Sequence, residues 1–253
     1  MFFFPDAVQY TRAADFGLAS EDVYFASADG SRLHGWFIAA AGAPRGTVLH
    51  LHGNAANISN HLPLVAWLPR AHYNVLLFDY RGFGKSAGAP TLDGVVEDGR
   101  AALAYLRTRR DVDANRLAVY GHSLGGATAL RMLAVDRAGV RIAIIESAFA
   151  SYRDIASDAT RGNLVFMLLR PFVITLPARE QDPITSLARI DIPLVFVHGD
   201  ADRVVPLAHG ERLFAAAREP KQWLAVAGAD HMEAGQRQEV QTKLRAALDG
   251  RLP

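Results

Sequence analysis

The sequence alternates between short apolar runs of strand length and longer amphipathic stretches of helix length. This alternation is typical of a mostly parallel sheet that is flanked by helices on both faces. Strands that are covered on both faces are apolar at consecutive positions. Runs of this kind span 47–51, 75–79, 117–120, 142–145 and 194–197. Helical patterns fall at 57–69, 91–109, 124–137, 206–218 and 234–249, and a last strand fits at 222–226.

The amino-terminal part departs from this rhythm. Residues 21–28 and 32–39 alternate, and Asp29-Gly30 between them favours a tight hairpin. We therefore expect an α/β fold in which an antiparallel hairpin precedes a mostly parallel sheet. A chain of 253 residues can close around one core, so we predict a single domain over 1–253.

Composition excludes several classes of protein. With 27 basic and 26 acidic side chains the net charge is +1, which argues against a nucleic-acid partner. The absence of cysteine excludes disulfide scaffolds, cysteine-ligated metal sites and cysteine nucleophiles. No stretch approaches the roughly 20 apolar residues of a membrane helix, so we expect no integral membrane segment. The amino terminus is unlike a signal peptide, which favours a cytoplasmic location; removal of an anchor would make a membrane-associated or periplasmic one possible.

The strongest local signal is the segment Gly121-His122-Ser123-Leu124-Gly125, which lies between a predicted strand and a predicted helix. A sharp turn from strand to helix projects a serine hydroxyl away from the sheet, and small residues on either side give the turn room. The helix that follows directs free N–H groups toward the place where negative charge would develop. We therefore predict that Ser123 is a nucleophile.

In this context the sequence resembles the α/β-hydrolase family over nearly the whole chain. In that family the acid and the histidine follow the serine in this order. The segment H-G-D-A-D-R-V-V-P at 198–206 is similar to the family's acid loop, and its match implies Asp202 as the triad acid. The loop before the last helix is similar to the family's histidine loop, which implies His231 as the base.

Other acids and histidines compete for these roles. Asp200 lies two residues before Asp202 and could serve only as a turn residue, whereas Glu146 lies at a strand end where some family members keep their acid. His209 follows Asp202 as well, but we expect it on the surface of a helix. We interpret the remaining candidates as surface or packing residues without the spacing of a metal site, namely His34, His61 and His72.

An acyl-transfer serine also needs donors for an oxyanion. The segment H-L-H-G-N-A-A-N at 50–57 resembles the family's oxyanion turn, which implies the backbone N–H groups of Asn54 and Leu124 as donors. We interpret Asn57 as the N-cap of the next helix. The segment Y-R-G-F-G-K-S at 80–86 lacks the first glycine of a phosphate-binding loop and resembles a structural segment of the family.

Residues 148–190 form a long connection with several prolines around an apolar run at 164–169. Such a connection is often a lid or cap, although these side chains could also simply extend the core. The resemblance implies a serine hydrolase without cofactor or metal, in the branch that includes esterases, depalmitoylases and serine aminopeptidases. We expect a small-molecule or lipid-like acyl substrate, an ester or thioester of short to medium chain, packed against 164–169 and Phe172. The alternatives are a serine aminopeptidase and a binding protein that has lost its chemistry; no oligomeric state is predicted.

Overall fold

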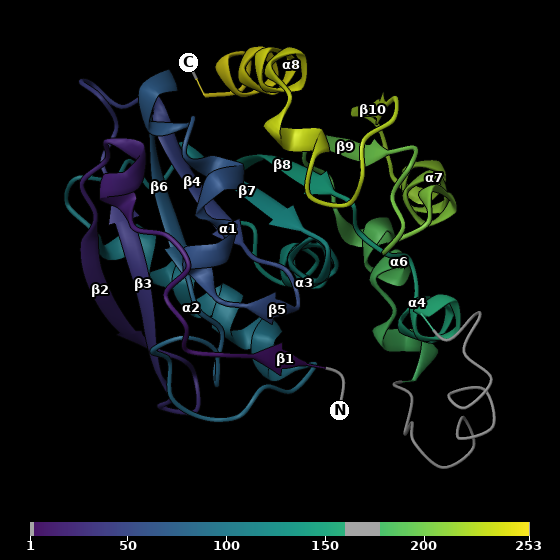
Figure 1. Cartoon of the computed structure of the whole chain (residues 1–253), viewed down its shortest axis with the longest axis horizontal. Coiled ribbons are helices and arrows are strands. Elements are labelled where there is room, and N and C mark those ends of the chain that lie inside the picture. Colours follow the sequence, from purple (N-terminus) through teal and green to yellow (C-terminus); the bar gives the residue numbers. More distant parts are fainter. Residues whose placement is uncertain (1–2, 160–177, 253) are drawn as a thin grey trace.

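A computed structural model describes residues 3–159 and 178–252 of the chain (Figure 1). Its centre is an eight-stranded sheet with the strand order β10-β9-β8-β7-β4-β6-β3-β2. The strands are β2 (Glu21–Ala26), β3 (Arg32–Ile38), β4 (Gly46–Leu51), β6 (Tyr73–Phe78), β7 (Leu117–His122), β8 (Val140–Glu146), β9 (Leu194–Gly199) and β10 (Lys221–Val226). Only β3 runs antiparallel to its neighbours β2 and β6; the other pairs are parallel. The predicted mostly parallel sheet with an antiparallel amino-terminal hairpin is confirmed.

Helices connect these strands, and most are shorter than their sequence patterns. The described α-helices are α1 (Ile58–Val65), α2 (Gly94–Thr108), α3 (Leu124–Leu133), α4 (Tyr152–Ala159), α6 (Pro183–Ser186), α7 (Leu207–Ala216) and α8 (Gln238–Asp249). Short 3-10 helices are η1 (Ala13–Phe16), η2 (Pro69–Ala71), η3 (Arg179–Gln181), η4 (Leu187–Arg189) and η5 (Ala234–Gln236). The pattern at 234–249 splits into η5 and α8 because Arg237 is extended, with φ −72° and ψ 131°. Within the described part of the chain, none of the helices combines the length and apolar character that crossing a membrane demands.

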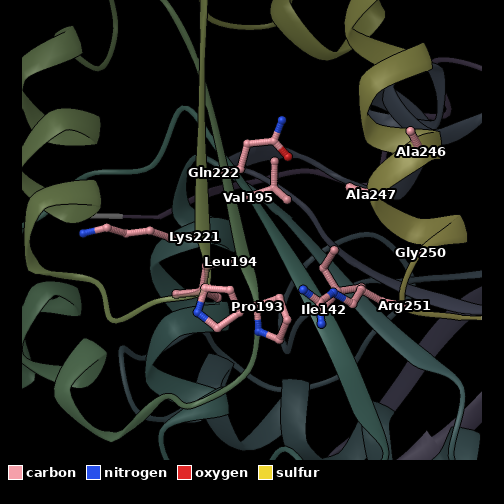
Figure 2. Close-up of a pocket in the computed structure, with 11 residues that line it drawn as sticks. Ile142, Pro193, Leu194, Val195, Lys221, Gln222, Ala246, Ala247, Gly250 and Arg251 are labelled. Carbon is pink, nitrogen blue, oxygen red and sulfur yellow. The ribbon is translucent and has the colours of Figure 1, made fainter.

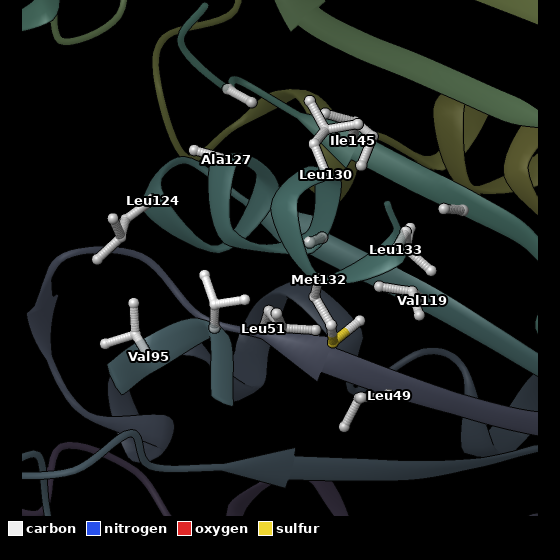
Figure 3. Packing of buried hydrophobic residues seen from close by; sticks show 14 of the residues in the cluster. Leu49, Leu51, Val95, Val119, Leu124, Ala127, Leu130, Met132, Leu133 and Ile145 are labelled. Carbon is white, nitrogen blue, oxygen red and sulfur yellow. The ribbon is translucent and has the colours of Figure 1, made fainter. Parts of the chain in front are cut away.

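The core has two layers, one on each face of the sheet. Successive residues of a strand point to opposite faces, so Leu49 and Leu51 of β4 pack with α2 and α3, while Val48 packs with α1 and α8. Figure 3 shows α3 packed against the strands, with Leu130 and Leu133 in the layer of the core that also contains Leu49 and Leu51. Ser123 immediately precedes α3, so this packing anchors the turn that carries the predicted nucleophile.

The amino-terminal segment forms a small second sheet that the sequence patterns do not predict. Strand β1 (Phe4–Pro5) pairs in parallel with β5 (Ala55–Ala56), which lies in the loop after β4. The Phe4 N–H donates to the Asn54 carbonyl at 3.2 Å, and the Asn57 side chain donates to Asp6 Oδ1 at 2.9 Å. The start of the described chain therefore holds the loop that contains the predicted oxyanion donor.

The predicted lid at 148–190 is described at both of its ends. These ends contact each other: the Tyr152 N–H donates to Asp182 Oδ1 at 2.9 Å, and the Ile184 N–H donates to the Ala150 carbonyl at 3.2 Å. The apolar run at 164–169 and Phe172, which carry the lid hypothesis, lie outside the described residues.

One prediction in this region is wrong. His209 in α7 is not a surface residue, because only 3% of it is exposed. Its Nδ1 accepts the Ala150 N–H at 3.1 Å and its Nε2 lies 3.0 Å from Asp158 Oδ2. The face of α7 that carries His209 packs against the loop after β8 and against α4, so the imidazole satisfies polar groups between elements.

Candidate active site

Ser123 occupies a sharp turn between β7 and α3, as predicted. Its backbone has φ 56° and ψ −118°, a conformation that residues other than glycine rarely adopt. The flanking glycines are required because a side chain at either position would overlap neighbouring backbone atoms. A Cβ on Gly121 would lie 2.5 Å from the Gly125 carbonyl oxygen, and a Cβ on Gly125 would overlap the carbonyl of Leu51. The Ser123 N–H donates to the Glu146 carbonyl at 2.8 Å, which fixes the turn to β8.

Asp202 and His231 meet at the carboxyl ends of the strands, where Ser123 also lies, in the loops after β9 and β10. His231 Nδ1 donates to Asp202 Oδ2 at 2.8 Å, while Asp202 Oδ1 accepts the N–H groups of Val204 and Val205 at 2.9 and 2.8 Å. Burial by itself raises the pKa of Asp202, but the hydrogen bonds from His231, Val205 and Val204 outweigh it, so the pKa lies below its usual value. The side chain is therefore a buried carboxylate that orients the histidine.

The two competing acids have other partners. Asp200 is exposed and accepts the Gly228 N–H at 2.6 Å, which closes a turn between the acid loop and the strand end of β10. Glu146 is fully buried, and it accepts the Gly235 N–H at 2.7 Å and the Tyr120 hydroxyl. In the described structure, therefore, the carboxylate hydrogen-bonded to the His231 ring is that of Asp202.

His122, which sequence patterns do not single out, joins the serine turn to the histidine loop. Its Nε2 donates to the His231 carbonyl at 2.9 Å, and the two rings lie 4.8 Å apart between centroids. Burial lowers the pKa of His122 to about 3, so the ring stays neutral at ordinary pH. Among the described residues no direct hydrogen bond joins the Ser123 hydroxyl to the His231 ring, and contacts of this kind often tighten only when substrate binds.

The two predicted oxyanion donors belong to the serine turn and to the loop after β4. Leu124 is the first residue of α3, so its N–H has no acceptor within the helix. The peptide that carries the Asn54 N–H is held through its carbonyl, because Gly53 accepts a hydrogen bond from His52 Nδ1 at 2.7 Å. The N-cap prediction for Asn57 is confirmed, since its side chain accepts the Ser59 N–H at 3.0 Å.

The segment at 80–86 has the structural role that we expected. Arg81 binds the fully buried Asp98 of α2 through its side chain, with Nη2 at 2.7 Å from Oδ1, and through its N–H at 2.8 Å from Oδ2. Ser86 accepts the His34 N–H at 2.9 Å and donates to the Asp79 carbonyl at 2.6 Å. These bonds hold the loop after β6 against the edge of the sheet.

A cavity of about 400 Å³ lies at the opposite end of the strands, near their amino ends (Figure 2). It is lined by the first residues of β9 and β10, by Ile142 near the start of β8, and by the end of α8. Ligands of open α/β sheets bind outside the carboxyl ends of the strands, where Ser123, Asp202 and His231 lie. This cavity is therefore separate from the candidate site. No cluster of three or more histidine or carboxylate side chains arranged for a metal ion is found in residues 3–159 and 178–252.

Comparison with known proteins identifies the family of the chain. Residues 42–183, more than half of the chain, match the family described as serine aminopeptidase, S33. The chain belongs to this family of α/β hydrolases. The hydrolase is 40% identical over 221 residues to the Uncharacterized protein YfhR of Escherichia coli (strain K12), which covers 85% of this chain and 75% of the relative. It is 36% identical over 221 residues to the Alpha/beta hydrolase domain-containing protein WAV2 of Arabidopsis thaliana, covering 82% and 70%.

Solved structures show the same fold for this hydrolase. The Pyrococcus furiosus esterase Pf2001 superposes with a TM-score of 0.79 at 21% identity, covering 100% of this chain and 97% of that chain. The esterase domain of a Rhodothermus marinus protein superposes with a TM-score of 0.70 at 22% identity, covering 93% and 100%. At these identities the likeness establishes the α/β-hydrolase fold of the chain.

Proposed function

We propose that this α/β hydrolase is a serine hydrolase that cleaves carboxylic esters or thioesters of short to medium acyl chains. The observation that carries the proposal is the pairing of His231 with the buried Asp202 at the sheet edge where Ser123 lies in its strained turn. Such a pairing holds an imidazole in the tautomer whose other nitrogen can accept a proton.

The proposed reaction has two halves. His231 Nε2 takes the hydroxyl proton of Ser123 as the serine oxygen attacks the acyl carbonyl, and the Asn54 and Leu124 N–H groups bind the oxyanion. The histidine then gives this proton to the leaving alcohol or thiol, and an acyl-enzyme remains. Water, deprotonated by the same histidine, releases the acid and restores Ser123.

We favour an ester or thioester substrate over a peptide, because an aminopeptidase needs a carboxylate that binds the amino group of its substrate. Near the His231 loop, the described carboxylates have other partners. Asp230 binds the Arg203 guanidinium, with Nε at 2.7 Å from Oδ2, and Glu146 is buried beneath the loop. Two of the proteins that share the fold are an esterase and an esterase domain. An aminopeptidase stays the second candidate because the matching family carries that description.

A substrate panel with one covalent probe tests the proposal. We expect turnover of p-nitrophenyl acetate, butyrate and octanoate, little turnover of aminoacyl anilides, and labelling of the wild type by a fluorophosphonate. Ser123→Ala is the control. It should not be labelled, and its turnover should be roughly a millionfold lower, because the triad acts as a unit. Faster turnover of aminoacyl anilides than of esters would identify an aminopeptidase. Labelling of neither protein, without turnover of any panel member, would indicate a binding protein.

A further inference from the structure

Glu146 is a charged residue in a place where charge is costly. It is the last residue of β8, and none of its surface is exposed. A buried carboxylate costs several kcal/mol unless donors satisfy it. Both of its oxygens are used: the Gly235 N–H donates to Oε1 at 2.7 Å, and the Tyr120 hydroxyl donates to Oε2.

These contacts join the two halves of the candidate site through one residue. The backbone carbonyl of Glu146 accepts the N–H of Ser123 at 2.8 Å, and its side chain holds Gly235, four residues after His231. The contact is close-packed, because a Cβ on Gly235 would lie 2.5 Å from Glu146 Oε2 and would overlap the Tyr120 hydroxyl. The nucleophile turn and the histidine loop are therefore set relative to each other by Glu146.

Burial raises the pKa of Glu146 above its usual value, and the hydrogen bonds from Tyr120 and Gly235 only partly oppose the rise. The contribution of the side chain that the geometry shows is the pair of hydrogen bonds that its oxygens accept.

Several other titratable groups around His231 have partners of their own. His122, from β7, has a pKa lowered by burial to about 3 and carries no charge at ordinary pH. Asp230, on the same loop, binds Arg203. His198, from β9, lies 3.6 Å from Asp202, donates to the Val205 carbonyl at 2.9 Å, and has its pKa lowered by burial.

We propose that Glu146 is a positioning residue of the hydrolase: its side chain ties the His231 loop to the Ser123 turn and so holds the imidazole in place for attack. This inference rests on the proposed function. No proton moves to or from Glu146; it acts through His231 and does not touch the reacting atoms.

Glu146→Ala tests the tie, and Glu146→Gln is its conservative control. Alanine removes both acceptors, whereas the amide oxygen of glutamine can still accept the Gly235 N–H. Misplacement of a catalytic group by about 1 Å can cost roughly a hundredfold, so we expect kcat to fall about ten- to hundredfold in Glu146→Ala with little change in KM. We expect Glu146→Gln to restore most of the lost rate. Rates are taken per fluorophosphonate-titrated site, so that only folded enzyme counts.

Gly235→Ala tests the tie from its other end, with the Glu146 side chain left unchanged. The added methyl displaces the loop, and misplacement of a catalytic group by about 1 Å can cost roughly a hundredfold. We expect kcat to fall about ten- to hundredfold with little change in KM. Gly250→Ala is the matched control, because the nearest atom to its Cβ is the Ala246 carbonyl oxygen at 3.4 Å, an ordinary contact.

The outcomes separate this inference from the proposed function. A wild type that neither turns over esters nor labels with the probe contradicts the proposed function. An active wild type for which Glu146→Ala keeps the wild-type kcat per titrated site overturns the positioning role. If Glu146→Ala gives no folded protein, Gly235→Ala decides: activity equal to that of Gly250→Ala overturns the tie.

Discussion

Ser123 has a backbone conformation that strains any residue with a Cβ, because its φ is 56° and its ψ is −118°. Such strain costs about 1–3 kcal/mol, and glycine relieves it. We expect Ser123→Gly to unfold at a higher denaturant concentration than Ser123→Ala, by about 1 kcal/mol or more in the free energy of unfolding. Both variants should be inactive. Chemical denaturation measures the difference, and equal stabilities would mean that the turn stores no strain at this residue.

The two aspartates of the acid loop differ by two positions but have different partners. Asp202 holds the His231 ring, whereas Asp200 accepts only the N–H of Gly228 at the surface. Asp202→Asn should lower kcat about ten-thousandfold, because an amide favours the wrong tautomer of the histidine. Asp200→Asn should stay within about twofold, as expected for a surface change away from the chemistry. The acid is misassigned if ester hydrolysis shows the opposite order.

At the scale of elements, the site is assembled from loops after β4, β7, β9 and β10, and the connection at 148–190 enters beside them. Its ends meet through Asp182 and Ala150, and His209 of α7 contacts the same place. Truncation of a side chain that lines an acyl pocket should change the preference for acyl chain length. Truncation of a side chain that only fills the core should lower the stability of the protein instead.

Phe166→Ala should penalise octanoate relative to acetate by about 1–3 kcal/mol if this side chain lines the acyl pocket. If it belongs to the core instead, the free energy of unfolding should fall by about 3–5 kcal/mol with no change in preference. The ratio of kcat/KM for the two esters and the melting temperature are measured on the same preparation. An unchanged ratio with a lowered melting temperature would remove the lid from the proposed function.

The molecule as a whole contains an unusual group of buried histidines near the site. Burial lowers the pKa of His50 and His122 to about 3, and also lowers the pKa of His52 and His61. These residues are neutral in the folded protein, whereas an unfolded histidine binds a proton below about pH 6.5. The unfolded state therefore binds more protons than the folded state between about pH 3 and 6.5, and stability must fall as the pH falls through this window.

Each such histidine should contribute a slope of up to about 1.4 kcal/mol per pH unit to the free energy of unfolding. Denaturation at intervals between pH 7 and 4 measures the total slope. His50→Asn provides the test, because the Asn amide can replace Nδ1 as the donor to the Tyr120 carbonyl, 3.0 Å away in the wild type, without titrating. We expect a shallower slope for this variant. An identical slope would mean that His50 is not a buried neutral group.

The sequence alone determined the sheet, its hairpin and the turn around Ser123, because these depend on local periodicity and on glycine spacing. Its matches to family motifs also named the loops of Asp202 and His231. Helix ends were less accurate, since capping and backbone breaks such as Arg237 depend on neighbouring elements.

Only the tertiary structure decided which of the neighbouring carboxylates contacts His231. Asp200, Asp202 and Glu146 are chemically similar, and no local pattern records which loop meets which across the sheet edge. Likewise, burial of His209, the contact of His122 with the His231 carbonyl and the double tie of Glu146 join segments from different strands. The one available signal was a glutamate directly after the apolar run at 142–145. Long-range contacts of this kind arise from packing, because their energy depends on partners that are distant in the chain.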